Sequence, residues 1–352
     1  MSPTDPSEWS VDRVAAELRT LSPAYAPTPL LDLPRLAARL GVAQVLVKDE
    51  GRRALGSFKS LGGTYAGLRA LARATGEDIA AIVSQRRTNL PTLICASDGN
   101  HGLAVAEAAR LAGGPARIYL HGGVPQERAE RIAALGAEVM RVAGTYDDAV
   151  AAAADAARSG SGVLVPDTSD DPADPVVRDV MAGYAVMAAE IRRQVQAAGH
   201  RAPTHLFVQA GVGGLAAAMA DELGDWLAAP GILVVVEPAA ARCVGAALDA
   251  GRPIQLDGDL LTAAAMLSCG RASAAALVVL LRRGARAVSV GEGVLREAPR
   301  LLLETDGPPS TPSGAAGLAG VRAVCARGGQ AAALQLGDDS RLLVVVTEGA
   351  AR

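Results

Sequence analysis

Lysine is almost absent from this 352-residue chain. Of its 34 basic side chains only two are lysines, Lys48 and Lys59, and all the others are arginines. A guanidinium stays protonated in proteins and does not act as an amine nucleophile. Any chemistry that needs a lysine amine is therefore confined to one of these two positions.

Aromatic residues and blocks of like charge are scarce as well. Phe, Trp and Tyr make up 3% of the chain, and 34 basic and 37 acidic side chains give a formal net charge of -3 without a basic run. Proteins that bind nucleic acid combine basic patches with aromatic side chains that stack on bases. We therefore expect no nucleic-acid partner.

The cysteine and histidine patterns argue against crosslinks and metal sites. The four cysteines lie far apart and form no C-x-x-C pair: Cys95, Cys243, Cys269 and Cys325. Such spacing predicts free, buried thiols rather than disulfides or a zinc site. Because His121, His200 and His205 have no partners at metal-ligand spacing, we expect no metal.

Long apolar runs are missing too. No segment reaches the roughly 18 apolar residues of a membrane span, and Met1–Pro6 contains no basic segment followed by an apolar run. We expect a cytoplasmic protein that has no membrane partner.

Short β-branched or apolar runs alternate with long alanine-rich stretches, and half of the residues are apolar. This alternation predicts an α/β fold in which helices cover a mostly parallel sheet. The expected strands are Gln44–Lys48, Thr92–Ala96, Ala116–Leu120, Glu138–Val142, Val163–Pro166, His205–Gln209, Ile232–Val236 and Leu342–Thr347. The expected helices include Ser57–Ala72, His101–Ala112, Gln126–Leu135, Tyr146–Ser159 and Val177–Ala198.

Lys59 follows Gly56-Ser57-Phe58 and opens one of these helices, with Ser57 as the expected N-cap. The positive end of the helix dipole disfavours a cation there and so lowers the pKa of the amine, which helps it act as a nucleophile. Lys48 is followed by two carboxylates, Asp49 and Glu50, that would hold it protonated. Lys59 is thus the better amine, although the motif alone also suits a solvated surface lysine.

The segment Ser97-Asp98-Gly99-Asn100-His101-Gly102 joins an expected strand to an expected helix. Small residues at such a turn let backbone amides and the Asn100 side chain approach an anion or a ring hydroxyl. An ordinary turn with Asp98 as the N-cap is the alternative, but it does not call for Gly, Asn, His and Gly in succession.

A second glycine-rich turn, Gly211-Val212-Gly213-Gly214, follows the expected strand His205–Gln209 and opens another helix. Its backbone amides are suited to bind a phosphate. The same run matches the G-x-G-x-x-A fingerprint, and Glu237 lies about where the ribose-binding acid of a nicotinamide enzyme would lie. That alternative, however, assigns no role to Lys59.

Polar residues end two further strands. Asp167-Thr168 follows one expected strand, and Thr347-Glu348-Gly349 ends the last one. Open α/β sheets bind ligands at the carboxyl ends of their strands. Either segment could also be an ordinary loop.

Taken in order, the motifs S-F-K, S-D-G-N-H-G, Q-A-G-V-G-G, V-E-P and V-T-E-G resemble the fold-type II pyridoxal-phosphate (PLP) enzymes, the tryptophan-synthase β family. More closely, they look like the diaminopropionate ammonia-lyases. The resemblance runs from about Pro27 to Gly349 and includes Gln126–Arg128, Tyr146–Asp148 and Met181–Tyr184. It implies two open, mostly parallel sheets flanked by helices, with a small lobe inserted in a larger one.

The resemblance also implies the roles of individual residues. Lys59 would carry PLP as a Schiff base, and Asn100 would face the pyridine hydroxyl. The phosphate would be bound by Gly211, Val212, Gly213 and Gly214, and the pyridine nitrogen by Thr347. The substrate contacts would come from Ser97, Asp98, Gly99, His101, Asp167, Thr168 and Ser313.

The implied reaction is α,β-elimination of D- or L-2,3-diaminopropionate, or a close analogue, to pyruvate and ammonia through an aminoacrylate. Lys59, or Asp98 on the opposite side, would remove the α-proton. Asp98 and Asp167 would keep the leaving ammonium protonated. A neutral hydroxyl at the pyridine nitrogen would favour elimination over transamination.

Other functions remain open at this point. A serine or threonine dehydratase, or a β-replacing synthase, would use the same fold and cofactor. A third possibility is a nicotinamide enzyme that uses the Gly211 turn, or a catalytically silent PLP-fold sensor.

Domain limits and assembly rest on the resemblance alone. Residues 1–91 and 162–352 would form the large cofactor-binding domain. Residues 92–161 would form a small lobe that binds the substrate carboxylate. A homodimer is expected on the same ground.

Overall fold

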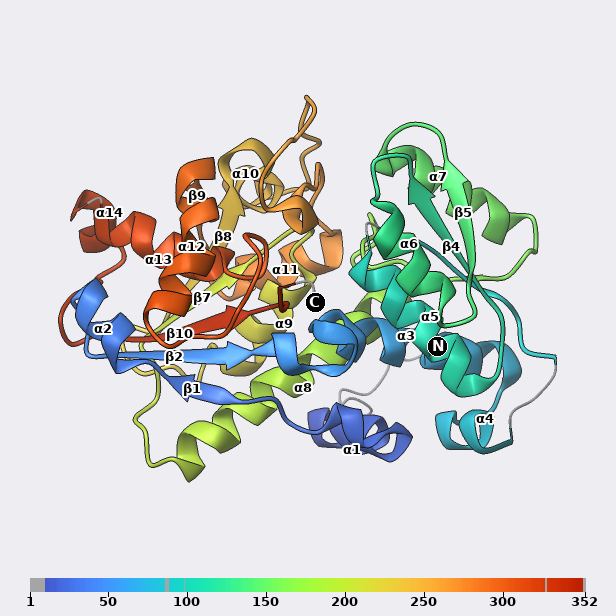
Figure 1. Cartoon of the computed structure of the whole chain (residues 1–352), viewed down its shortest axis with the longest axis horizontal. Coiled ribbons are helices and arrows are strands. Elements are labelled where there is room, and N and C mark those ends of the chain that lie inside the picture. Colours follow the sequence, from blue (N-terminus) through green and yellow to red (C-terminus); the bar gives the residue numbers. More distant parts are fainter. Residues whose placement is uncertain (1–9, 86–88, 98, 327, 351–352) are drawn as a thin grey trace. The chain divides into compact units, whose positions relative to one another are not determined.

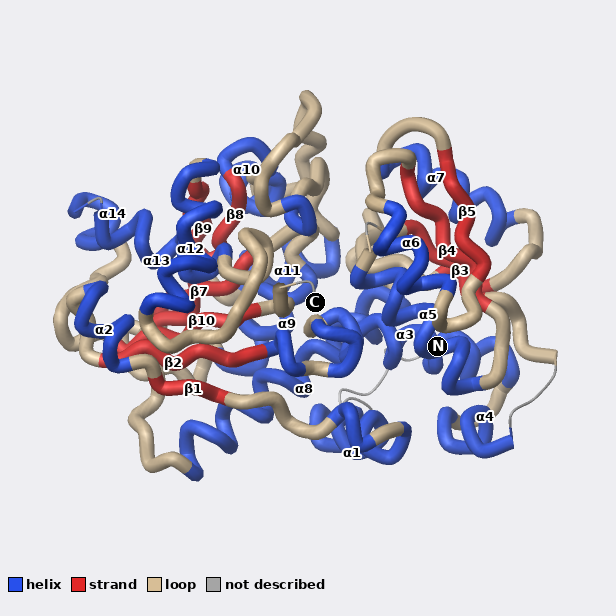
Figure 2. The backbone as a smooth tube through the Cα atoms, viewed as in Figure 1, coloured by secondary structure: helices blue, strands red, loops and turns tan. Residues whose placement is uncertain are grey.

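The computed structural model describes residues 10–85, 89–97, 99–326 and 328–350. It divides the chain into two compact units (Figures 1 and 2). Unit 1 comprises the chain up to Ala26, Lys59–Asp167 and Asp174–Val186. Unit 2 comprises Pro27–Phe58, Thr168–Ala173 and the chain from Met187 onward.

Unit 2 is built on a six-stranded sheet in the order β1-β2-β10-β7-β8-β9, in which β1 alone is antiparallel to its neighbour. The strands are β1 (Leu30–Asp32), β2 (Gln44–Asp49), β7 (His205–Gln209), β8 (Ile232–Pro238), β9 (Arg286–Val290) and β10 (Arg341–Val346). The helices are α2 (Pro34–Leu40), α9 (Gly214–Leu223), α10 (Cys243–Ala250), α11 (Ala274–Arg282), α12 (Glu292–Glu304), α13 (Ala316–Ala326) and α14 (Gly328–Ala333).

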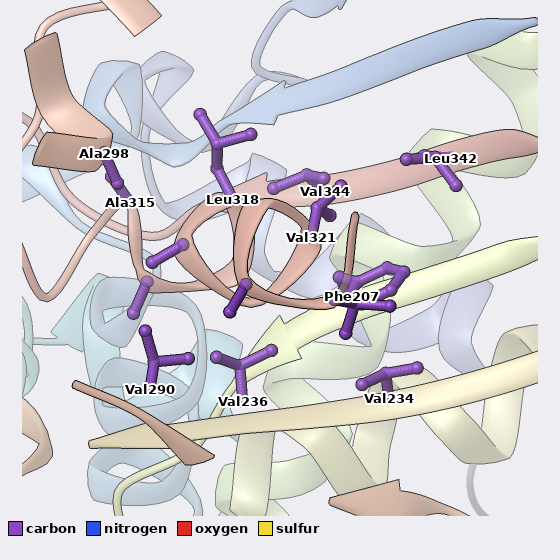
Figure 3. Packing of buried hydrophobic residues seen from close by; sticks show 14 of the residues in the cluster. Phe207, Val234, Val236, Val290, Ala298, Ala315, Leu318, Val321, Leu342 and Val344 are labelled. Atoms are coloured by element: carbon purple, nitrogen blue, oxygen red, sulfur yellow. The ribbon is translucent and has the colours of Figure 1, made fainter. Parts of the chain in front are cut away.

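The core of unit 2 lies where α13 packs on the sheet. Figure 3 shows Leu318 and Val321 of this helix beside side chains of β7, β8 and β10. The approach is close because α13 carries glycine at the contact: a Cβ on Gly320 would lie 2.3 Å from Val236 Cγ2. Central strands buried on both faces read as continuous apolar runs, which is why the sequence pattern located them well.

Unit 1 contains a four-stranded parallel sheet in the order β5-β4-β3-β6. The strands are β3 (Leu93–Ala96), β4 (Ala116–His121), β5 (Glu138–Val142) and β6 (Val163–Leu164). The helices are α1 (Val11–Leu21), α3 (Lys59–Thr75), α4 (Ile79–Gln85), α5 (Asn100–Ala112), α6 (Gln126–Ala133) and α7 (Tyr146–Arg158). The long helix α8 (Pro175–Ala197) begins in unit 1 and ends in unit 2.

Small residues set the packing of α3 in unit 1. A Cβ on Gly63 would lie 2.6 Å from the Ala104 Cβ, and one on Gly67 would lie 2.6 Å from the Ala108 Cβ. The backbones of α3 and α5 therefore approach closely along this seam. The start of α3, where Lys59 lies, is held by the packing of the whole helix.

The predicted fold class is confirmed: the protein is α/β, with two open, mostly parallel sheets flanked by helices. All eight expected strands occur, with ends shifted by at most two residues. The short strand β1 and the half-exposed strand β9 were missed. The domain limits expected from the sequence remain a prediction.

The expected N-cap role of Ser57 stays a prediction. The helix α3 begins at Lys59, and Ser57 is extended, with φ -157° and ψ 159°. It pairs with Glu348 in an isolated antiparallel bridge, so the backbone there extends the sheet edge rather than the helix. Within the part of the chain that the structure describes, no helix combines the length and apolar character of a membrane crossing.

Candidate functional site

Lys59 is the first residue of α3, and its ammonium faces an acid. Its Nζ donates to Asp167 Oδ2 at 2.6 Å, and the two side chains are 20% and 13% exposed. Burial by itself raises the pKa of the Asp167 carboxyl, but the charge of Lys59, helped by His101, outweighs burial and lowers it to about 2. The structure thus brings together two of the predicted catalytic residues, which lie 108 positions apart.

Tyr184 of α8 is a third member of this cluster in unit 1. Its ring centroid is 5.9 Å from Lys59 Nζ, so the amine lies over the face of the ring. Burial raises the pKa of the Tyr184 phenol to about 12, so it is neutral at physiological pH. The ring reaches α3 because Gly62 leaves room: a Cβ there would lie 2.3 Å from Tyr184 Cε1.

Lys48, the other lysine, lies on β2 of unit 2 and is fully buried. Its three N–H groups donate to Glu190 Oε2 at 2.7 Å, Gln194 Oε1 at 3.0 Å and the Thr28 carbonyl at 2.8 Å. Burial lowers the pKa of Lys48 below its usual range, while Glu50 and Glu190 oppose the shift. With no exposed surface, this amine is closed to an aldehyde.

The loop that precedes α5 is shaped by Ser97. Its hydroxyl oxygen accepts the N–H groups of Gly99 at 2.9 Å and Gly102 at 2.8 Å. Gly99 has φ 147°, a conformation that side chains with a Cβ rarely adopt. Asn100 follows as the first residue of α5. Asp98, predicted to be catalytic, lies outside the described residues.

His101 faces the interior of unit 1. It is 4% exposed, and its Nε2–H donates to the Val165 carbonyl at 2.8 Å. Burial lowers the pKa of His101, so the ring is neutral at physiological pH. These contacts account for the ring as a packing element, and its role in binding substrate stays a prediction.

The loop Gly211–Gly214 joins β7 to α9 in unit 2. Its carbonyls are bonded within the unit: Gly211 accepts from Cys243 Sγ at 3.2 Å and Val212 accepts from the Ser273 N–H at 2.9 Å. Within the described residues, none of its four amides donates to another protein group. Gly213 has φ 97° and forms the N-cap of α9.

This loop fits the phosphate of PLP. Four unused amides at a helix N-terminus suit a phosphate, because they supply donors and the positive end of the helix dipole. A Cβ on Gly211 would lie 3.0 Å from Cys269 Sγ, so a side chain at this position would be tightly packed. The assignment of the loop to the phosphate stays a prediction that this geometry suits.

Glu237 does not face a ligand, contrary to what a nicotinamide enzyme would need. It is 1% exposed, and its carboxylate accepts the N–H groups of Val244 at 2.7 Å and Gly245 at 2.8 Å. Burial raises the pKa of Glu237 to about 7. The acid thus serves the first turn of α10, which removes the ribose-binding residue of that alternative.

Thr347 directly follows β10 and is held from two sides within unit 2. Its hydroxyl accepts from Gln209 Nε2 at 2.9 Å, and its N–H donates to the Gly314 carbonyl at 3.1 Å. Its carbonyl accepts the N–H of Phe58 at 3.0 Å. Because Phe58 immediately precedes Lys59 in the chain, this bond anchors the backbone one residue before Lys59.

The remaining predicted substrate contacts lie in unit 2. The Ser313 hydroxyl accepts the N–H of Met266 at 3.1 Å, so its oxygen is already used within the unit. Thr168 precedes Ser169, whose carbonyl accepts the N–H of Ala274 at 2.9 Å. Their substrate roles stay predictions. Among the described residues, no group of three or more His, Cys, Asp or Glu side chains could hold a metal ion.

Two residues of the site were missed from the sequence. Tyr184 belongs to a segment that carried the family resemblance, but no pattern assigned it a role. Gln209 is a polar residue at the end of a buried strand, which is the same signal that singled out Asp167 and Thr347. Applied to every strand end, that signal would have found Gln209.

The chain matches the family model described as pyridoxal-phosphate dependent enzyme over residues 21–348. It is 32% identical over 350 residues to diaminopropionate ammonia-lyase of Escherichia coli strain K12, covering 96% of this chain and 88% of that protein. It is 33% identical over 325 residues to a biosynthetic L-threonine dehydratase of Mycobacterium leprae, covering 91% and 69%.

A solved structure shows the same similarity. It is the crystal structure of diaminopropionate ammonia lyase from Escherichia coli in complex with an aminoacrylate-PLP azomethine reaction intermediate. The TM-score is 0.86 at 32% sequence identity, and the match covers 99% of this chain and 91% of that chain.

Proposed function

Because this chain belongs to the pyridoxal-phosphate dependent enzymes, we propose that it is an ammonia-lyase acting on 2,3-diaminopropionate or a close analogue. Its cofactor is PLP, and it falls in the β-eliminating group of diaminopropionate ammonia-lyases and threonine dehydratases. The proposed products are pyruvate and two molecules of ammonia.

Each cofactor contact is assigned to one residue or loop. Lys59 would bind PLP covalently, and Asn100 would bind its ring hydroxyl. The amides of Gly211–Gly214 would bind its phosphate, and the hydroxyl of Thr347 would bind its ring nitrogen. When bound, PLP withdraws electrons from the α-carbon of the substrate, which makes the α-proton removable.

The observation that carries the proposal is the contact between Lys59 and Asp167 at 2.6 Å. A lysine released from its covalent bond to the cofactor can take the α-proton on its Nζ. Asp167 stays ionised at neutral pH, because its pKa is about 2. It can therefore pair with the β-ammonium of a diamino acid.

The elimination balances as follows. The α-proton passes to Lys59, or to Asp98 for the opposite stereoisomer, and the bond between the β-carbon and nitrogen breaks. The nitrogen keeps the bonding pair and leaves as ammonia, having stayed protonated beside Asp167. The unsaturated amino acid that is released reacts with water to give pyruvate and the second ammonia.

A substrate panel tests this function. Purified holoenzyme is given D- and L-2,3-diaminopropionate, L-serine and L-threonine, and pyruvate or 2-oxobutyrate is measured together with ammonia. We expect the diamino acid to give the highest kcat/KM and two ammonias per pyruvate. If serine or threonine is turned over best, with one ammonia per oxo acid, the enzyme is a dehydratase and the proposal is wrong.

A second measurement tests the two proton acceptors. Asp98→Asn should lower turnover of one stereoisomer of diaminopropionate much more than that of the other, because each acceptor serves one face of the substrate. Equal turnover of both stereoisomers before and after the change would contradict the role of Asp98 but not the elimination itself.

A further inference from the structure

Gln209, the last residue of β7, occupies a central position in unit 2. Its side chain is 2% exposed. Its Nε2 lies 2.7 Å from the Gly314 carbonyl oxygen, 3.2 Å from the Ser313 carbonyl oxygen and 2.9 Å from Thr347 Oγ1. One amide group thus contacts both the Ser313–Gly314 turn and the end of β10.

The two carbonyls decide which way this amide points. A carbonyl oxygen can only accept hydrogen bonds, so the group that faces Ser313 and Gly314 must be the NH2 and not the oxygen. The same NH2 faces Thr347 Oγ1. The Thr347 oxygen is therefore an acceptor towards Gln209.

Because the Thr347 oxygen accepts a hydrogen bond from Gln209, the hydrogen of the Thr347 hydroxyl points away from Gln209. A threonine hydroxyl has one hydrogen and two lone pairs. Within the residues that the structure describes, Gln209 is the side chain bonded to Thr347 Oγ1, and no protein acceptor receives the hydroxyl hydrogen. That hydrogen is available to an acceptor that the protein itself does not provide.

This orientation of the Gln209 amide leaves its oxygen without a hydrogen bond from any residue that the structure describes. Among the described residues, the Gln209 Oε1 is buried without a hydrogen-bond partner. A buried acceptor without a donor is unfavourable. The Gln209 side chain keeps this orientation although its oxygen is unpaired within the described part of the chain, which indicates that the hydrogen bonds of its NH2 group are the ones that fix it.

We propose that Gln209 is a positioning residue that makes the hydroxyl of Thr347 a hydrogen-bond donor to the ring nitrogen of PLP. The inference rests on the contact between Thr347 and the ring nitrogen stated in the proposed function. A donor hydroxyl stabilises the unprotonated ring nitrogen. The ring then stores less negative charge, which favours β-elimination over transamination.

The test is a double-mutant cycle on the holoenzyme, with Gln209→Met, Thr347→Val and the double variant. The readouts are the visible absorption spectrum, the rate at which PLP is lost on dilution, and the number of turnovers before fresh PLP is needed. We expect Gln209→Met to speed PLP loss about tenfold, the effect of one lost hydrogen bond of about 1.4 kcal/mol. In the Thr347→Val background it should add almost nothing.

Gln209→Glu is the second variant, and it also serves if Gln209→Met does not fold. A carboxylate only accepts, so it would draw the Thr347 hydrogen away from the ring. We expect a changed spectrum and fewer turnovers per PLP, both absent when Thr347 is valine. Gln44→Met, at the other end of the sheet, is the matched control and should leave the spectrum and the rate of PLP loss unchanged.

The outcomes separate the two ideas. If the effects of Gln209→Met and Thr347→Val simply add, Gln209 acts through general packing and the inference is wrong. If Thr347→Val alone changes neither the spectrum nor the rate of PLP loss, the assigned role of Thr347 is wrong. Neither result depends on which amino acid is the substrate, which the substrate panel decides.

Discussion

The surroundings of Lys48 and Lys59 differ in solvent exposure and in the protein acceptors around the amine. Lys48 is fully buried, and all three of its N–H groups are used by protein acceptors. Lys59, eleven residues later, is 20% exposed and faces the carboxylate of Asp167. The comparison shows that the same side chain is structural where it is sealed and available for chemistry where one side is open.

The Lys48 region is a closed charge network in unit 2. Arg53 donates to both Glu50 and Glu190, and Glu190 also accepts from Lys48. Buried charges are tolerated only when paired in this way, and removing one partner leaves the others uncompensated. Lys48, Glu50 and Arg53 lie at the end of β2 or just after it, so the network holds the chain segment that leads to Lys59.

Exchanging the amine at Lys59 should have the largest effect. Lys59→Ala is expected to lower kcat/KM by roughly 10³-fold or more, because covalent attachment and the proton acceptor are lost together. The protein should still fold. Borohydride reduction followed by peptide mass spectrometry should find PLP on Lys59 in the wild type.

Lys59→Arg is the control, since it keeps the charge beside Asp167 but cannot form the covalent bond. It should be as inactive as the alanine variant. PLP trapped on Lys48 in any of these proteins would overturn the comparison of the two lysines.

Lys48→Met should affect stability instead. We expect a loss of roughly 3 kcal/mol in the free energy of unfolding, at the low end for a broken buried pair because Arg53 still faces Glu190. Urea unfolding measures the loss. The Lys48→Met protein that folds should still carry PLP on Lys59. Loss of PLP from this folded protein would mean that Lys48 takes part directly in PLP binding.

Asp167→Asn should lower kcat by roughly 30-fold to 100-fold, because an amide cannot hold the leaving nitrogen protonated by charge pairing. The pKa of Asp167 is about 2, below its ordinary value, so its carboxylate is already ionised from pH 5 to 8. The variant should therefore lower the plateau of the pH–rate profile without removing a limb in that range. Asp155→Asn, an exposed acid paired with Arg158, is the matched control.

Glu237→Gln should have the smallest effect, on stability alone. The folded pKa of about 7 lies above the ordinary value of 4.5, so the folded protein binds more protons than the unfolded chain between these pH values. The stability contributed by this group is present below pH 4.5 and lost as pH rises through 7. As pH rises from 5 to 8, the free energy of unfolding of Glu237→Gln should increase relative to that of the wild type by roughly 2 kcal/mol.

Thermal unfolding at several pH values measures this difference. Asp225→Asn is the control, because it removes an exposed carboxylate of unit 2 that is paired with Arg283. A gain that stays constant with pH would show that Glu237 is not the titrating group. In that case the contrast between Asp167, whose pKa is lowered by Lys59, and Glu237, whose pKa is raised by burial, would be smaller than these shifts indicate.

Local sequence signals predicted the fold and much of the candidate site. Alternating apolar runs identified the central strands, since these are buried on both faces. Glycines at strand ends identified the loop Gly211–Gly214, and elimination among two lysines identified Lys59. The weakly apolar strand β9 and the three-residue strand β1 lacked such a pattern.

By itself, the sequence determined that an amine must be Lys48 or Lys59, that helices cover mostly parallel strands, and that glycine-rich turns follow two of them. These are local properties of composition and spacing. Only the tertiary structure decided that Lys48 is sealed by Glu190, 142 residues away, that Asp167 faces Lys59, and that Gln209 donates to the Thr347 hydroxyl. The hydrogen bonds and pKa values of such groups depend on burial and on partners that are distant in the sequence. Neither burial nor these partners can be inferred from the neighbouring residues in the chain.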